Sequence, residues 1–173
     1  MYPLQGARRE DGPLNRGLRR SRKIGAGVLI AVVGVDQALK LAVASTHPLG
    51  VSTALLDGIL SLTYIRNPGA AFGLLPQVPV LVPALIALTL LYALFYNDAR
   101  WAAPLRVQGA LALLAGGAVG NLIDRIRLGA VVDYIDVHFW PVFNVADLAV
   151  TAGAALLMIS LVARTPPAAA DPR

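Results

Sequence analysis

Cysteine is absent from the 173 residues of the chain. Disulfides, cysteine nucleophiles and thiolate metal sites are therefore excluded. Histidine is scarce, with only His47 and His138 present. A catalytic zinc ion usually has three protein ligands, drawn largely from histidine, cysteine and carboxylates. We therefore expect neither a metal nor another cofactor.

Charged residues are also few. They make up 14% of the chain, whereas 57% of the residues are hydrophobic. This composition is too apolar for an ordinary soluble domain, and the chain is too short for more than one bundle of helices. We therefore expect a single membrane domain.

The formal net charge of +5 comes mainly from basic residues near the N-terminus. No aromatic residues are interleaved with them, which argues against a nucleic-acid partner. The basic run is instead typical of an anchor to anionic membrane lipid. Its members are Arg8, Arg9, Arg16, Arg19, Arg20, Arg22 and Lys23.

Four stretches are long and apolar enough to be membrane-spanning helices, which need about 20 residues. They lie near residues 24–44, 77–97, 104–124 and 145–163. The first follows a basic run, but it is too long for the apolar part of a signal peptide and has no obvious cleavage site after it. The predicted fold is therefore an all-α membrane protein with four transmembrane helices.

The distribution of lysine and arginine predicts the orientation. Seven precede residue 24, and Arg100, Arg106, Arg164 and Arg173 bring the total on that side of the membrane to eleven. Only Arg66, Arg125 and Arg127 lie on the other side. Since the cytoplasmic side carries the excess of basic residues, both termini should be cytoplasmic and the loops 45–76 and 125–144 should lie outside.

The chain divides into three parts by this reasoning. Residues 1–23 form a basic cytoplasmic extension, 24–163 the membrane domain, and 164–173 a Pro/Ala-rich cytoplasmic tail that should be disordered. The outer loop "GILSLTYIRNPGAAFGLL" begins with a β-branched and aromatic run that favours a short strand. We therefore expect a small extracytoplasmic β-strand and loop element.

The polar residues inside this apolar chain fall at one depth, near the outer side. A carboxylate at mid-bilayer costs about 2.5 to 3.5 kcal/mol on insertion scales, so such residues normally face a bundle interior or a water-filled cavity. We expect these side chains to line one wet cavity near the outer interface. They are Asp36 and Lys40 in the first helix, Asn121 and Asp124 at the end of the third, Asp133 in the outer loop, and Asn144 and Asp147 at the start of the fourth.

Two pairs of these residues also have a purely structural interpretation. Asp36 and Lys40 are spaced i, i+4 on one helical face and could simply neutralise each other. Asp124 and Arg125 stand at a helix end, where an arginine lowers the pKa of a neighbouring carboxylate and keeps it ionised. For this second pair we favour a structural ion pair over a role in chemistry.

Single residues have simple alternatives as well. Asp147 could complement the dipole of a helix N-terminus, and Asp133 could form a turn. Gly116 and Gly120 have the spacing of small residues that allows two membrane helices to approach closely.

Two carboxylates in one small cavity can do what one cannot. Held close together they cannot both ionise cheaply, so they share a proton and divide the roles of acid and base. The base activates a water that attacks a peptide carbonyl, and the acid helps to protonate the leaving amine. Gly-x-Ser-x-Gly, His-Glu-x-x-His and Walker motifs are all absent, and Ser45 near Lys40 is weak support for a serine/lysine pair.

A different class of function remains open at this point. In a proton-coupled transporter, Asp36, Asp124, Asp133 and Asp147 would form a relay. A relay should distribute acids through the depth of the membrane, whereas these lie at one depth, so we favour the peptidase.

Five motifs occur in order along the chain: "DQALK" (36–40), "RNPGAAFG" (66–73), "GGAVGNLIDR" (116–125), "GAVVDYIDV" (129–137) and "FNVAD" (143–147). This series resembles that of bacterial lipoprotein signal peptidase, or signal peptidase II, over residues 24–163. The resemblance implies an aspartic endopeptidase of the bacterial inner membrane, with its active site near the outer face. It would remove the signal peptide from diacylglyceryl-modified prolipoproteins by cutting before the lipidated cysteine. Globomycin would inhibit it, and membrane lipid would surround it.

The same resemblance implies roles for individual residues. The catalytic pair of the family corresponds to Asp133 and Asp147 in this sequence. Asp136 lies outside the matched positions. The positions implied to support the site or bind substrate are Asp36, Lys40, Asn67, Gly117, Gly120, Asn121, Asp124, Arg125, Val131, Asn144 and Ala146.

Overall fold

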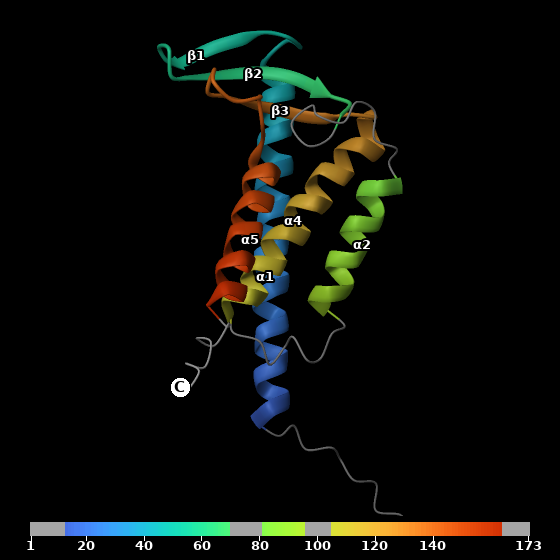
Figure 1. Ribbon diagram of the computed structural model, residues 1–173. Helices are drawn as coiled ribbons and strands as arrows, with labels where there is room; N and C mark the ends of the chain where they lie inside the picture. Colours follow the sequence, from blue (N-terminus) through green and yellow to red (C-terminus); the bar gives the residue numbers. More distant parts are fainter. Residues whose placement is uncertain (1–12, 70–80, 96–104, 164–173) are drawn as a thin grey trace, which may run out of the picture.

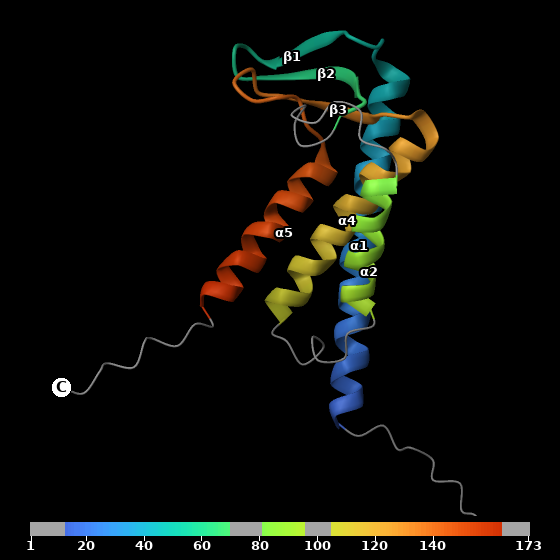
Figure 2. The same ribbon diagram turned by 45° about the vertical axis from the view of Figure 1, so that its right-hand side comes forward.

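The computed structural model describes residues 13–69, 81–95 and 105–163, with side chains from residue 21 onward. Within these residues, four helices stand side by side, and a small antiparallel sheet lies across one end of them (Figures 1 and 2). The predicted tail 164–173 and the first twelve residues lie outside the described residues.

Helix α1 runs over Pro13–Thr46 and is much longer than the predicted 24–44. Its 34 residues correspond to about 51 Å, whereas the hydrocarbon core of a bilayer is about 30 Å thick. The N-terminal part of α1 extends beyond the other helices in Figure 1. The predicted boundary at residue 23 therefore lies inside a continuous helix, because arginine, leucine and lysine are good helix formers and Pro13 suits a first turn.

In the described part of the chain, three helices are long and apolar enough to cross a membrane: Ser21–Thr46 within α1, α4 (Leu105–Leu128) and α5 (Val145–Val162). Helix α2 (Leu81–Phe95) is apolar but has only 15 described residues. The remainder of the predicted stretch 77–97 lies outside the described residues. The membrane character is confirmed, while the fourth crossing remains a prediction.

Helix α4 is the centre of the bundle and packs against α1, α2 and α5. Glycines allow these close approaches. A Cβ at Gly116 would stand 2.9 Å from the Cβ of Val32 in α1, and one at Gly153 would stand 2.8 Å from the carbonyl oxygen of Ala110. The close helix contact predicted from Gly116 and Gly120 is therefore confirmed.

The sheet has three antiparallel strands in the order β1 (Ser52–Leu56), β2 (Leu60–Asn67) and β3 (Val131–Asp136). The strand predicted in the first outer loop is β2. Asp133, expected in a loop or turn, lies instead within β3 opposite Ile65. The run "VVDYID" has the β-branched and aromatic residues that favour a strand, and its pairing with β2 and its burial override the preference of aspartate for turns.

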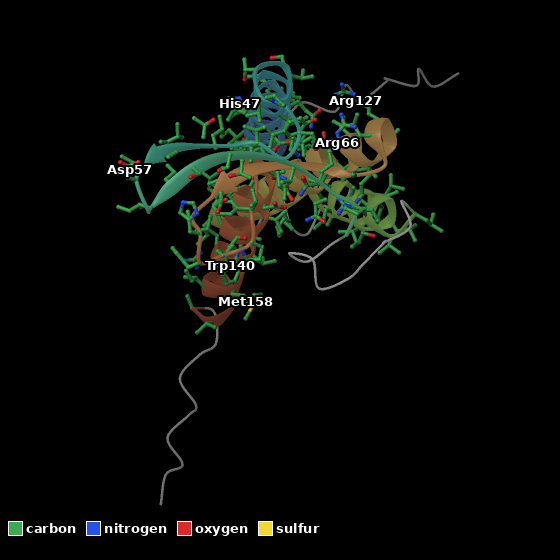
Figure 3. All side chains as sticks on the ribbon, turned by 90° about the horizontal axis from the view of Figure 1, so that it is seen from above. His47, Asp57, Arg66, Arg127, Trp140 and Met158 are labelled. Carbon is green, nitrogen blue, oxygen red and sulfur yellow. The ribbon has the colours of Figure 1, made fainter. Side chains whose placement is uncertain are left out.

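The sheet covers the ends of the helices where the predicted polar residues lie (Figure 1). Tyr64 and Val132 of the sheet pack with Val43 of α1 in a small buried cluster. From above, Asp57 marks the β1–β2 turn, which projects away from the helices, while Arg66 lies toward the opposite end of β2 (Figure 3). The sheet therefore closes the bundle above the predicted site.

Candidate active site

The two predicted catalytic aspartates come from adjoining elements, a strand of the sheet and the helix that begins beneath it. Asp133 is on β3 and its side chain is buried. Asp147 is the third residue of α5, where its carboxylate accepts a hydrogen bond from the backbone N–H of Asn144, the N-cap residue, at 3.3 Å. The carboxylate therefore does complement the helix N-terminus, as one alternative proposed, within a reciprocal capping box.

Asn144 contacts both aspartates and is itself completely buried. Its Nδ2 donates to Asp133 Oδ1 at 2.6 Å, and its Oδ1 accepts from the backbone N–H of Asp147 at 2.9 Å. Because a single amide side chain bonds to both residues, the cap of α5 also sets the position of Asp133 relative to Asp147.

Two further asparagines donate to the aspartates. Asn67 Nδ2 bonds to Asp133 Oδ2 at 3.1 Å, and Asn121 Nδ2 bonds to Asp147 Oδ1 at 2.8 Å. Asparagine suits these positions because it donates hydrogen bonds to a carboxylate without adding charge. All three asparagines named by the sequence therefore surround the two carboxyl groups.

Burial raises the pKa of Asp133 to about 7, and the negative charge of Asp147 acts in the same direction. The hydrogen bonds from Asn67 and Asn144 and the charge of Lys40 oppose this shift. Asp133 can therefore hold a proton near neutral pH, as one member of an acid/base pair must.

Behind the asparagines lies a buried cluster of Asp36, Lys40 and Asp124. Lys40 Nζ lies 2.9 Å from Asp36 Oδ2 and 2.8 Å from Asp124 Oδ2. The predicted pairing of Asp36 with Lys40 is confirmed, but Lys40 is shared with a second carboxylate. The cluster thus holds one positive and two negative side chains.

The predicted ion pair between Asp124 and Arg125 is wrong. Consecutive residues of a helix point in different directions, and here Asp124 faces Lys40 while Arg125 donates to the carbonyl oxygen of Gly69 at 2.7 Å. Arg125 also donates to the carbonyl oxygen of Asn121 at 3.3 Å. It therefore joins α4 to the segment that follows Asn67.

The buried carboxylates each hold an element that carries a catalytic candidate. Asp36 Oδ1 accepts from the backbone N–H of Ala146 at 2.9 Å, next to Asp147. Asp124 Oδ2 accepts from the backbone N–H of Val132 at 3.1 Å, next to Asp133. Asp36 and Asp124 therefore position α5 and β3 respectively.

The glycines of the motif permit this close packing. A Cβ at Gly120 would stand 2.6 Å from Asp36 Oδ2, and one at Gly117 would collide with the carbonyl oxygen of Ala146. Val131 is buried at the start of β3 and pairs with Asn67 of β2. These positions shape the backbone around the site rather than contributing reactive groups.

Sequence reasoning overlooked Gln37, although it lies in the first motif. Its Nε2 is 3.1 Å from both Asp124 Oδ1 and the carbonyl oxygen of Gly120, and 3.2 Å from Asp36 Oδ2. The signal was available, since a polar residue three positions before Lys40 in an apolar helix shares its face.

Asp136 lies apart from this network, as expected. It accepts from Thr63 Oγ1 at 2.9 Å and from the backbone N–H of His138 at 2.9 Å. The hydrogen bond from the His138 N–H holds the pKa of Asp136 below its usual value. In the described part of the chain, no three acidic or histidine side chains are arranged to bind a metal ion.

The chain is similar to known proteins. Residues 28–163 match the family model of signal peptidase (SPase) II. The lipoprotein signal peptidase of Pelotomaculum thermopropionicum is 46% identical over 136 residues, which cover 78% of this chain and 89% of that protein. That of Syntrophus aciditrophicus is 42% identical over 140 residues, covering 76% and 87%.

Solved structures are similar as well. One bacterial membrane enzyme superposes with a TM-score of 0.75 at 33% identity and covers 87% of this chain and 94% of its own. A second gives a TM-score of 0.71 at 35% identity, covering 83% and 95%. The family match spans all the aspartates and asparagines described above. On these grounds the chain belongs to the signal peptidase II family of membrane peptidases.

Proposed function

We propose that the protein is an aspartic endopeptidase that removes the signal peptide from diacylglyceryl-modified prolipoproteins, cutting before the lipidated cysteine. The observation that carries the proposal is the pair Asp133 and Asp147 joined by Asn144, in a chain of the signal peptidase II family. The relatives' name supplies the substrate class, because they are lipoprotein signal peptidases.

The geometry supports different roles for the two aspartates, one as the acid and the other as the base. The raised pKa of Asp133 makes it the acid, which holds the shared proton. Asp147, at a helix N-terminus and bonded by Asn121, carries the negative charge and acts as the base. Asp147 takes a proton from water as the water attacks the scissile carbonyl, and Asp133 donates its proton to the carbonyl oxygen. When the tetrahedral intermediate collapses, Asp147 passes the proton taken from water to the leaving amine, and Asp133 takes back a proton from the oxygen as the new carboxyl group forms.

The place of the site suits a lipidated substrate. Asp133 is in the sheet and Asp147 is in the first turn of α5, at one end of the apolar helices, so the diacylglyceryl chains can stay in the bilayer while the scissile bond reaches the carboxyl groups. The protein would be a multi-pass protein of the bacterial cytoplasmic membrane, with both termini cytoplasmic and the site near the outer face. The supporting observation is the eleven-to-three distribution of basic residues.

The test uses the purified protein in detergent with a lipidated prolipoprotein. Mass spectrometry should detect loss of the signal peptide and a product that begins at the lipidated cysteine. Globomycin should block the reaction, and EDTA should leave it unchanged. Efficient cleavage of the same precursor without its diacylglyceryl group would contradict the proposed substrate.

Variants of the two aspartates test the proposed chemistry. Asp133→Asn and Asp147→Asn should each abolish cleavage, because each removes an oxygen that can carry the proton. Asp57→Asn, on the projecting β1–β2 turn, is the matched control and should cleave at the rate of the unmodified protein (Figure 3). Full activity of either active-site variant would exclude the proposed pair.

A further inference from the structure

The Lys40 ammonium group lies outside contact with either catalytic candidate, yet it reaches the network that holds them. Its Nζ donates to Asn121 Oδ1 at 2.9 Å, in addition to its two carboxylate partners. An ammonium group has three N–H donors, so all three are used. Lys40 is only 3% exposed, which keeps water from competing for these bonds.

The amide of Asn121 has two possible orientations, which exchange its oxygen and nitrogen. In the structure, Oδ1 accepts from Lys40 and also from Asn144 Nδ2 at 3.1 Å, whereas Nδ2 donates to Asp147 Oδ1 at 2.8 Å. In the opposite orientation, the amide nitrogen would face the ammonium group and the amide oxygen would face the carboxylate. Both contacts would then be repulsive.

We infer that Lys40 is a positioning residue for the catalytic pair, acting by fixing the orientation of the Asn121 amide. This orientation directs an N–H donor at Asp147 and, through Asn144, a second N–H donor at Asp133 at 2.6 Å. Lys40 thus determines which ends of the Asn121 and Asn144 amides face the carboxyl groups of Asp147 and Asp133. The inference rests on the proposed function for its consequence in catalysis.

The two carboxylates beside Lys40 keep it in place. Asp36 and Asp124 are 0% and 2% exposed, and each also accepts a backbone N–H, from Ala146 and Val132 respectively. Because backbone N–H groups hold both carboxylates in position, the Lys40 ammonium group is fixed opposite Asn121. A lone asparagine in a pocket of neutral groups would have no such preference between its two orientations.

The first test is Lys40→Met, with Gln37→Leu as the matched control. Gln37 contacts the same two carboxylates as Lys40, but Asn121 is not among its hydrogen-bond partners in the described part of the chain. Lys40→Met should lower kcat about 100-fold, the effect expected for a reacting group misplaced by about 1 Å, and leave KM within a factor of about two. In Lys40→Met, the fall of kcat on the acid side of the pH profile should move to higher pH. In Gln37→Leu, this fall should occur at the same pH as in the unmodified protein.

A double-mutant cycle separates the route through Asn121 from the direct effect of losing a charge. If Lys40 acts through the amide, Lys40→Met should change kcat and its pH profile far less in an Asn121→Ala background than in the unmodified protein. Equal effects in both backgrounds would overturn the inference.

A melting curve identifies whether Lys40→Met is folded. If it is not, the triple variant Asp36→Asn/Lys40→Met/Asp124→Asn replaces it, because its cluster is neutral. Removing the net negative charge of the cluster would by itself make the catalytic pair ionise more easily and move the fall of kcat on the acid side to lower pH. A shift to higher pH therefore supports the loss of amide orientation, and no shift or a shift to lower pH overturns it.

Failure of the inference can be told from failure of the proposed function. If Asp133→Asn and Asp147→Asn are inactive while the Lys40 variants behave like the unmodified protein, only the role of Lys40 is wrong. If Asp133→Asn or Asp147→Asn remains active, the catalytic pair itself is wrong.

Discussion

Asp133 is a buried carboxyl group whose proton affects folding as well as the proposed catalysis. Its pKa is about 7 in the folded protein and about 4 in an unfolded chain. Between these values the folded state binds more protons than the unfolded state, so Asp133 makes the protein less stable as pH rises through this window. The penalty is at most about 4 kcal/mol above pH 7, at about 1.4 kcal/mol for each unit of pKa shift.

The first prediction follows from this linkage. The melting temperature of Asp133→Asn, measured relative to the unmodified protein, should rise as pH increases from 5 to 8, since asparagine has no ionisation penalty. The difference in melting temperature at any one pH also contains a cost that does not depend on pH. It arises because the new amide N–H would face a donor group of Asn67 or Asn144. Asp57→Asn should show no such trend, and a flat difference for Asp133→Asn would mean that the carboxyl group ionises normally.

The second prediction concerns the shared lysine. Asp36→Asn and Asp124→Asn each leave Lys40 one carboxylate, so each should destabilise by only about 1 to 3 kcal/mol, the range for a hydrogen bond to a charged group. The double variant leaves a buried ammonium group without a charge partner, which costs about 3 to 5 kcal/mol in addition to the lost hydrogen bonds.

Chemical or thermal unfolding of the two single variants and the double variant in detergent measures this coupling. The loss in the double variant should exceed the sum of the single losses. Additive losses would show that Lys40 interacts with the two carboxylates independently. Arg125→Gln should leave the coupling unchanged, because Arg125 bonds to Gly69 and Asn121 rather than to Asp124.

The sequence predicted which polar residues gather near the site, but it did not predict which of them form ion pairs with each other. Depth in the membrane and the motif series indicated that Asp36, Asp124, Asp133 and Asp147 gather at one level. The partner of Asp124 was misassigned, because sequence adjacency favoured Arg125 while the true partner, Lys40, is 84 positions away. Contacts between different helices depend on the rotation of each helix about its axis, which hydropathy alone does not specify.

Helices α4 and α5 pack so closely that the backbone of one defines the site carried by the other. The third prediction is that Gly117→Ala destabilises the protein by about 1 to 3 kcal/mol, the range for overpacking, and lowers activity. The new methyl group would collide with the carbonyl oxygen of Ala146 and lie 2.8 Å from Val150 Cγ2, so α5 and with it Asp147 must move.

Gly109→Ala is the matched control for this substitution. Gly109 is in the same helix, and an added Cβ would have no neighbour within 4 Å. Its melting temperature should be unchanged or higher, since alanine is favoured over glycine in a helix by up to about 1 kcal/mol. Equal destabilisation of both variants would attribute the effect to α4 itself rather than to its contact with α5.

At the scale of the elements, helices were easier to predict than strands. Apolar length located α4 and α5 within a few residues, because a membrane helix satisfies its own backbone hydrogen bonds. Strand β2 was recognisable from its β-branched and aromatic residues. Strand β3 was not predicted, although its residues favour a strand, because its partner β2 is distant in the sequence: Asn67 and Val131 pair across 63 intervening residues.

For the whole molecule, the direction in which the chain crosses the membrane decides where the active site lies. The sheet and the aspartates are at one end of the bundle, and Ala163 follows the last residue of α5 at the other (Figure 1). The 18 residues of α5 correspond to about 27 Å, close to the thickness of the hydrocarbon core. Asp57 and Ala163 should therefore face opposite aqueous compartments.

The absence of cysteine allows a direct test, since a single introduced thiol is the only one in the protein. In intact spheroplasts, a membrane-impermeant maleimide should label Asp57→Cys and leave Ala163→Cys unlabelled, because the excess of basic residues predicts that the C-terminal end of α5 is cytoplasmic. Permeabilising the membrane should make both variants react, which shows that each thiol is accessible. Labelling of Ala163→Cys alone in intact spheroplasts would place the aspartates on the cytoplasmic side, where a secreted, lipidated precursor could not reach them after export.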